Sequence, residues 1–252
     1  MNLARPSSLN DAAPGKAVGV TRAAAYFLVM RPQLTTLTVE APDPAGPGRF
    51  WAALLGREMI VDAAGVRLPG DDTQVGLRFV AGRAGRLGTN RIHLHLTSDD
   101  PDDQQRIVAA ALDLGGRHLD VGQRPEEGHI VLADPAGYEF CVIEPGNDFL
   151  AGCGPLGELA CDGTREVGLF WSRALGWPLV WDQDGETAIQ SPHGGTKIAW
   201  GGPPLRPKTE PSRQLFELVT DSVDELLSLG ATRLGPGLLA DPDGNEFRIR
   251  PA

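Results

Sequence analysis

Two histidines, His93 and His95, stand one residue apart in the segment Arg91–Thr97. The segment alternates polar and apolar side chains, which predicts a β-strand with one buried face. Residues two apart on a strand share a face, so both imidazoles should point away from the face of Leu94 and Leu96. Imidazole serves as a ligand of divalent metals or as a general base near neutral pH. Without neighbouring carboxylates, such a pair is more typical of the polar lining of a pocket.

Two sequence motifs, each present twice in the same order, indicate that the chain is a tandem duplication. The first motif reads FWAALLG at 50–56 and FWSRALG at 170–176. The second reads LADPAGYEF at 132–140 and LADPDGNEF at 239–247. The motifs lie closer together in the second repeat, which is therefore the shorter one. In both repeats the Asp-Pro-x-Gly segment predicts a type I turn between two strands.

A strand, a helix and three short strands recur four times along the chain. The clearest copy starts with the His93 strand and continues with a helix that Asp100 caps and Gly115 ends. The other copies start near residues 34, 156 and 214. The four helices are expected at 49–55, 101–114, 165–175 and 223–229. The sequence therefore predicts an α+β fold of four βαβββ modules.

Each repeat is expected to form a domain around its own apolar core. The first core should contain Phe50, Trp51, Leu54, Leu94, Leu96, Phe140 and Val142. The second should contain Phe170, Trp171, Leu175, Phe216, Leu218, Phe247 and Ile249. The domains are predicted at 31–146 and 156–252, with a linker at 147–155. Residues 1–30 are rich in Ala, Pro and Ser and are predicted to be a disordered tail, with Met1 or Met30 as the start.

Charge and composition limit the classes of partner. The chain has 33 acidic and 23 basic residues and a net charge of −10, without a basic run, which argues against nucleic-acid binding. No apolar run approaches the ~20 residues that cross a bilayer. Its three cysteines have no metal-binding spacing and are typical of a reducing compartment. We therefore expect a cytoplasmic monomer or homodimer whose partner is a small molecule.

The paired modules, the FWxxxLG helix and the DPxGxEF hairpin resemble the vicinal oxygen chelate superfamily. That superfamily includes glyoxalase I, bleomycin-resistance proteins and extradiol dioxygenases, and the resemblance is closest to its bacterial glyoxalase-like branch. It covers roughly residues 34–250 and implies two tandem cup-shaped domains, each binding its ligand on the concave face of a sheet. In members that use a metal, the first and last strands of each module supply histidine or glutamine and carboxylate ligands.

The resemblance and the strand alternation together assign a lining to each cup. The first cup is expected to contain Thr36, Thr38, Arg78, His93, His95 and Cys141. His93 falls at the histidine position of the superfamily, but Cys141 falls where a carboxylate is usual. The second cup is expected to contain Glu158, Lys197, Glu217 and Arg248. Here Leu215 replaces the histidine. Glu139 and Glu246 are expected to bond to the backbone of their hairpins instead.

Cofactor and metal binding are not expected in either cup. One of the four usual ligands, His93, is present in the first cup, and the second cup carries a lysine and an arginine. Positive charges near the centre of a cup would repel a divalent cation. The expected cofactor set is therefore empty.

Three functional hypotheses fit this sequence. The first is a metal-independent binding protein of the bleomycin-resistance type. The second is a lyase, an isomerase or a dioxygenase-like enzyme that uses His93. The third treats one repeat, more readily the second, as a scaffold without a site. The charges of the second cup can pair with one another, so we expect the ligand in the first cup, with His93 and Arg78 as polar anchors.

Overall fold

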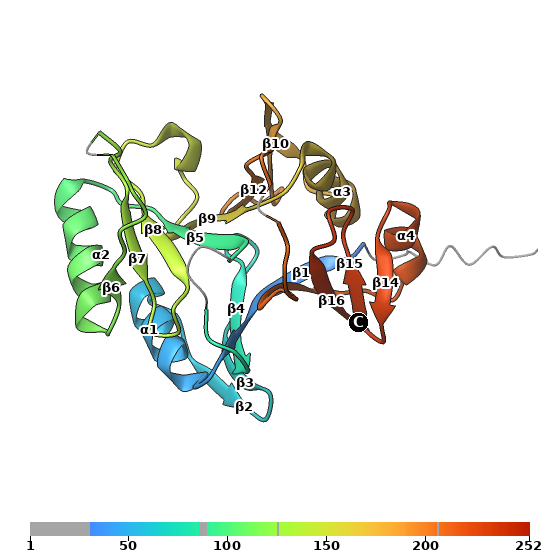
Figure 1. The fold of residues 1–252 in the computed structure, drawn as a ribbon, viewed down its shortest axis with the longest axis horizontal. Helices are drawn as coiled ribbons and strands as arrows, with labels where there is room; N and C mark the ends of the chain where they lie inside the picture. The colour runs from blue at the N-terminus through green and yellow to red at the C-terminus, as the bar shows by residue number, and fades with distance from the viewer. Residues whose placement is uncertain (1–30, 86–89, 125, 206) are drawn as a thin grey trace, which may run out of the picture.

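The computed structural model describes residues 31–85, 90–124, 126–205 and 207–252. The predicted tail and both candidate start residues lie outside these ranges. The described residues form four βαβββ modules in two eight-stranded sheets (Figure 1). The predicted α+β fold is therefore confirmed. No helix among the described residues is long and apolar enough to cross a membrane.

The first repeat contains two modules. Module 1 consists of β1 (Gln33–Ala41), α1 (Ala45–Leu55), β2 (Ile60–Asp62), β3 (Gly65–Leu68) and β4 (Gly76–Ala81). Module 2 consists of β5 (Ile92–Leu96), α2 (Pro101–Asp113), β6 (Arg117–His118), β7 (Ile130–Ala133) and β8 (Glu139–Val142). A single 3-10 turn, η1 (Asp148–Leu150), lies inside the predicted linker.

The second repeat contains the other two modules. Module 3 consists of β9 (Leu156–Cys161), α3 (Arg165–Leu175), β10 (Leu179–Gln183), β11 (Glu186–Gln190) and β12 (Lys197–Trp200). Module 4 consists of β13 (Gln214–Val219), α4 (Val223–Ser228), β14 (Thr232–Gly235), β15 (Leu238–Ala240) and β16 (Glu246–Arg250).

The helix ends follow local chemistry. The Asp100 side chain caps α2 by accepting a hydrogen bond of 2.7 Å from the Asp103 amide, as expected. Helix α1 begins four residues before the expected start. The additional turn contains a Gly-Pro-Gly segment, which the sequence pattern did not predict to be helical. Gly48 is required there, because a Cβ at this position would lie 2.5 Å from Cγ1 of Val66. The glycine lets α1 pack closely on β3.

The Asp-Pro-x-Gly segments form the predicted turns. Oδ1 of Asp134 accepts hydrogen bonds of 2.9 Å from the amides of Ala136 and Tyr138. The Gly137 amide donates to the Asp134 carbonyl at 2.9 Å, with Gly137 at φ +90°. Asp241 makes the matching bonds in the second repeat.

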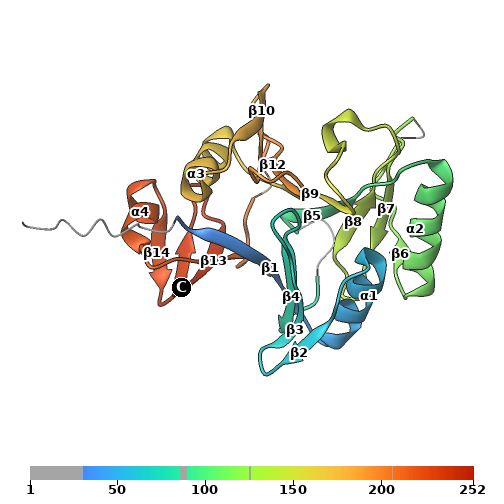
Figure 2. The same ribbon diagram turned by 180° about the vertical axis from the view of Figure 1, so that it is seen from behind.

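The two sheets each combine strands from both repeats. Sheet A has the order β14-β15-β16-β13-β1-β4-β3-β2, so modules 1 and 4 meet at the antiparallel pair β1–β13 (Figure 2). Sheet B has the order β10-β11-β12-β9-β5-β8-β7-β6, so modules 2 and 3 meet at β5–β9. The expectation that successive modules of one repeat would build one cup was therefore wrong.

Modules of the same repeat contact each other through their apolar faces. Helices α1 and α2 lie at one end of the molecule, and α3 and α4 lie at the other (Figure 1). The Trp51 and Phe140 rings pack at 5.0 Å in the first repeat, and Trp171 and Phe247 pack at 5.0 Å in the second. All the predicted core residues belong to one continuous apolar cluster, in which Leu54 and Ile249 are only partly buried. The expectation of two separate cores was therefore wrong, because the two repeats share one cluster as well as both sheets.

Candidate functional site

Each sheet has a second face, opposite the helices, that carries its polar side chains. We call these faces cup A and cup B after their sheets. On the central strand of sheet B, Ile92, Leu94 and Leu96 are buried in the core, so His93 and His95 face cup B. The same alternation adds Glu139, Cys141, Glu158, Ala160, Lys197 and Ala199 to that face.

Four of these residues form one row across sheet B. His95 pairs in register with Cys141 on β8 and with Glu158 on β9. Glu158 pairs in turn with Lys197 on β12. The row therefore brings two residues from each repeat to the centre of cup B.

The centre of the row is an ion pair. Nδ1 of His95 lies 2.7 Å from Oε2 of Glu158, and the Glu158 side chain is only 10% exposed. Burial lowers the pKa of His95, but the hydrogen bonds and charges of Cys141 and Glu158 outweigh it and raise that pKa from 6.5 to about 10. At neutral pH His95 is therefore an imidazolium with a proton on each ring nitrogen. In that state it can donate hydrogen bonds but cannot act as a base.

Cup B contains a second contact between a histidine and a carboxylate, formed by His93 and Glu139. Nε2 of His93 lies 3.0 Å from Oε2 of Glu139 and 3.3 Å from the Asn90 carbonyl oxygen. Glu139 therefore contacts a side chain of cup B. Glu139 is two residues from Cys141 on the same strand, so both side chains face cup B. Both contacts of His93 are made by Nε2.

Aromatic residues form the rim of cup B. Phe149 from the predicted linker and Trp181 from β10 pack edge to face, with ring centroids 6.0 Å apart. Nζ of Lys197 lies 4.3 Å from the Phe149 ring centroid and donates to the Phe149 carbonyl oxygen. Trp181 is 39% exposed. Sequence reasoning missed both aromatic residues, because neither belongs to a repeated motif.

A cavity of about 400 Å³ lies over this part of the sheet. Its polar lining includes Arg91, His93, Glu158 and Asp162, and its apolar lining includes Phe149, Ala160, Trp181, Ala188 and Ala199. Pockets of this size and mixture are typical of sites for small organic molecules.

Charged side chains of cup A also form pairs. Glu217 forms an ion pair with Arg250 and accepts a hydrogen bond of 3.0 Å from Oγ1 of Thr38. Arg78 binds both carboxylate oxygens of Asp62 at 3.1 Å. A cavity of about 590 Å³ lies at the edge of this face, lined by several further Asp and Arg side chains. The predicted pairing of Glu217 with a basic side chain of the same cup is present, with Arg250 as its partner.

The predicted site residues are therefore distributed differently from the expectation. Cup A holds Thr36, Thr38, Arg78 and Glu217, together with the exposed Arg248 that pairs in register with Glu217. Cup B holds His93, His95, Cys141, Glu158 and Lys197. The proposed anchors His93 and Arg78 thus lie on different sheets. The reason is that sheet B takes its second half from module 3 rather than from module 1.

The donors of cup B do not fit a divalent metal. The row ends in Lys197, whose ammonium group would repel a cation. Over the described part of the chain, no group of three or more His, Cys, Asp or Glu side chains is arranged to hold a metal ion. A catalytic metal usually needs three such protein ligands and one open position.

Comparison with known proteins identifies the family of each repeat. The glyoxalase-like domain family matches the chain twice, at residues 36–143 and 158–250. The fold is similar to glyoxalase I from Zea mays, with 14% identity and a TM-score of 0.56 over 86% of this chain and 92% of that chain. It is also similar to a proposed dioxygenase from Bacillus subtilis subsp. subtilis str. 168, with 12% identity and a TM-score of 0.55 over 86% of this chain and 84% of that chain. At these identities the likeness shows the fold alone. No curated protein matches the sequence.

Proposed function

This chain belongs to the glyoxalase-like domain family, and we propose that it binds a small organic molecule in cup B without a resident metal. It would then act in the cytoplasm as a binding protein of the bleomycin-resistance type. The observation that carries the proposal is the cavity of about 400 Å³, where the polar groups of cup B meet an aromatic rim. Members of one fold family differ in function, so the site itself must support the assignment.

The contrast between the two cups supports cup B. Both cups contain paired charges, such as Glu217 with Arg250 in cup A and His95 with Glu158 in cup B. What distinguishes cup B is that the rings of Phe149 and Trp181 form an apolar surface beside the side chains of His93 and Glu158. An apolar wall with a few convergent polar groups is the usual composition of a ligand pocket.

A binding screen tests this proposal. We expect hits from a small-molecule library to raise the melting temperature of the wild-type protein, because a ligand that binds only the folded state stabilises it. The stabilisation should be lost in His93→Ala and in Trp181→Ala. The control is Glu217→Ala, which changes cup A and should keep the response. Hits that survive both cup B substitutions and disappear with Glu217→Ala would place the site in cup A.

A second candidate function is an enzyme, a lyase or isomerase in which His93 is the base. The contact of 3.0 Å between His93 and Glu139 favours it, because a buried carboxylate on one ring nitrogen orients the other toward a substrate. A substrate that binds in cup B would then be converted to a product by the protein. Mass spectrometry of each hit after incubation with wild type and with His93→Gln separates the two functions. Conversion by wild type alone supports the enzyme, whereas unchanged compound supports the binding protein.

A further inference from the structure

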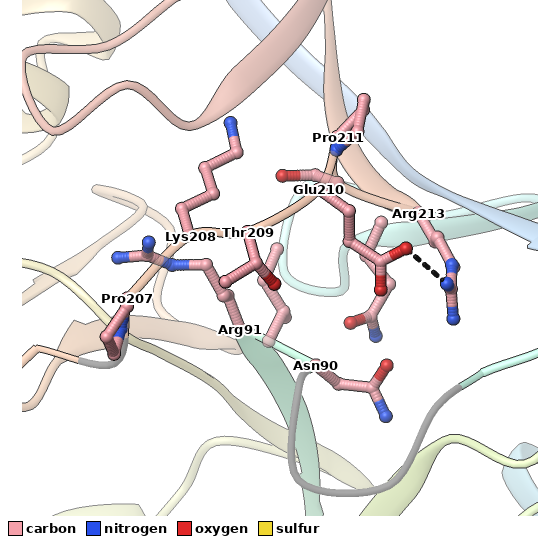
Figure 3. Close-up of a pocket in the computed structure, with 11 residues that line it drawn as sticks. Asn90, Arg91, Pro207, Lys208, Thr209, Glu210, Pro211 and Arg213 are labelled. Atoms are coloured by element: carbon pink, nitrogen blue, oxygen red, sulfur yellow. Dashed lines mark hydrogen bonds and ion pairs between the residues drawn. The ribbon is translucent and has the colours of Figure 1, made fainter.

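The Arg91 side chain lies at one end of cup B. Arg91 directly precedes β5, and its carbonyl oxygen accepts a hydrogen bond of 2.8 Å from the Asp162 amide. Its side chain lines the cavity of cup B together with His93 and Glu158. It also lines a neighbouring cavity of about 300 Å³ beneath the connection from β12 to β13 (Figure 3). Arg91 thus contributes to the lining of both cavities.

One edge of this guanidinium has no acceptor. Nε and Nη2 of Arg91 are both buried, and neither has a hydrogen-bond partner among the described residues. These two nitrogens form the same edge of the planar group, and their N–H bonds point in nearly the same direction. A buried guanidinium without acceptors is unfavourable in a folded protein, so this edge calls for an explanation.

Neighbouring carboxylates do not provide hydrogen-bond acceptors for this edge of Arg91. Figure 3 shows Glu210 bonded to Arg213 on one side of the pocket, with the Arg91 guanidinium on the other side, toward Pro207. Glu246 is held by Lys208 and by the Ser212 amide. Asp162 lines the same cavity as Arg91, but no ion pair or hydrogen bond joins the two side chains, and Oδ2 of Asp162 is itself without a partner among the described residues.

We propose that the ligand of cup B is a small organic carboxylate whose two oxygens accept hydrogen bonds from Nε and Nη2 of Arg91. This inference rests on the proposed binding function and names the chemical class of its ligand. Two parallel N–H groups match a planar carboxylate in bidentate geometry, which a single ammonium group cannot do. The apolar body of the ligand would lie against Ala160, Ala188 and the ring of Trp181, which line the same cavity.

Paired probes test the carboxylate directly. Naphthoate and its neutral amide, naphthamide, have the same apolar body and differ in the anionic group. By isothermal titration calorimetry we expect wild type to bind naphthoate at least about tenfold more tightly than naphthamide, as a charge-assisted bidentate pair allows. Arg91→Met should remove this preference and leave the Kd for naphthamide unchanged. Arg91→Lys keeps the charge without the two-nitrogen edge and should restore only part of it.

The free protein provides an independent test. If the Arg91 edge is a vacant binding group, Arg91→Met should leave the melting temperature unchanged or raise it, because an unpaired buried charge is removed. If Arg91 instead holds the fold together through a water bridge to Asp162, the same variant should unfold at a lower temperature, and the inference would be overturned.

The two proposals fail in different ways. Equal affinity of wild type for naphthoate and naphthamide would overturn the carboxylate inference and leave cup B intact as a binding site. A preference for naphthoate that persists in Arg91→Met would do the same. If neither probe binds, cup B as a site for such molecules is overturned together with the inference that depends on it.

Discussion

Nε1 of Trp51 donates a hydrogen bond of 3.0 Å to Oδ2 of Asp134, which links the helix of module 1 to the hairpin of module 2. Trp171 and Asp241 repeat this bond at 3.3 Å between modules 3 and 4. The two motifs that mark the duplication are thus the two ends of one buried contact. Each motif needs the other, because the carboxylate that shapes the hairpin also receives the indole proton.

Trp51→Phe should destabilise the protein by about 1–3 kcal/mol, because a buried carboxylate loses a donor. Trp171→Phe should cost less, since its bond is longer. Trp200→Phe is the matched control: Trp200 is equally buried, and its indole makes no hydrogen bond within the described residues. Urea unfolding measures all three. A loss in Trp200→Phe as large as that in Trp51→Phe would attribute the effect to volume alone.

Stability should depend on pH through His95. The folded-state pKa of about 10 lies above the ordinary 6.5, so the folded state binds the proton more tightly than the unfolded state does. The stabilisation from the His95–Glu158 pair is therefore complete below about pH 6.5 and is lost as pH rises toward 10. One proton limits the slope to about 1.4 kcal/mol per pH unit.

Urea midpoints of wild type and His95→Gln, measured from pH 6 to pH 10, check this dependence. The variant should be less stable at the lower pH and should converge on wild type as the pH rises. Parallel curves for the two proteins would show that His95 is not charged in the folded state.

The first repeat alone, residues 31–146, should not be a stable monomer. It would leave β1 without β13 and β5 without β9, and open strand edges pair with other chains. Because modules 2 and 4 are equivalent, two copies can pair β1 of one with β5 of the other. We expect a homodimer in light scattering, and a well-folded monomer would contradict the interlocked sheets.

Chelation of metal ions should not change the stability of the protein. If cup B functions without a metal, excess EDTA should not shift the melting temperature, since only an ion bound to the folded state contributes to stability. Elemental analysis of the purified protein should show substoichiometric transition metal. A chelator-sensitive melting temperature that metal restores would favour the enzyme hypotheses over the binding protein.

Local features of the fold were predictable from sequence. The cap at Asp100, the turn at Asp134 and the extent of α3 depend on residues within a few positions of one another. The faces of the strands followed from alternation, which correctly separated Leu94 from His95. The same rule, applied consistently, would also have placed Glu139 in phase with Cys141.

The pairing of modules was not predictable in this way. Strands β5 and β13 have similar lengths, and each sends apolar side chains into the core. Local pattern therefore does not show which of them is the neighbour of β1. Only long-range contacts decide which strands pair. They place Glu158 beside His95, and they place Arg78 on a different sheet from His93. The unpartnered edge of Arg91 likewise has no signature in sequence.

The crossed pairing of the modules also sets an order of assembly during synthesis. Modules 2 and 3 are adjacent in the chain, so the sheet that carries cup B can close before module 4 has left the ribosome. Strand β1 is made first but must wait for β13. Oγ1 of Thr35 and the Glu217 carbonyl oxygen, which bond at 3.0 Å, are 182 residues apart. Contacts between such distant positions form slowly, so the inner pair of modules should provide the surface on which the outer pair folds.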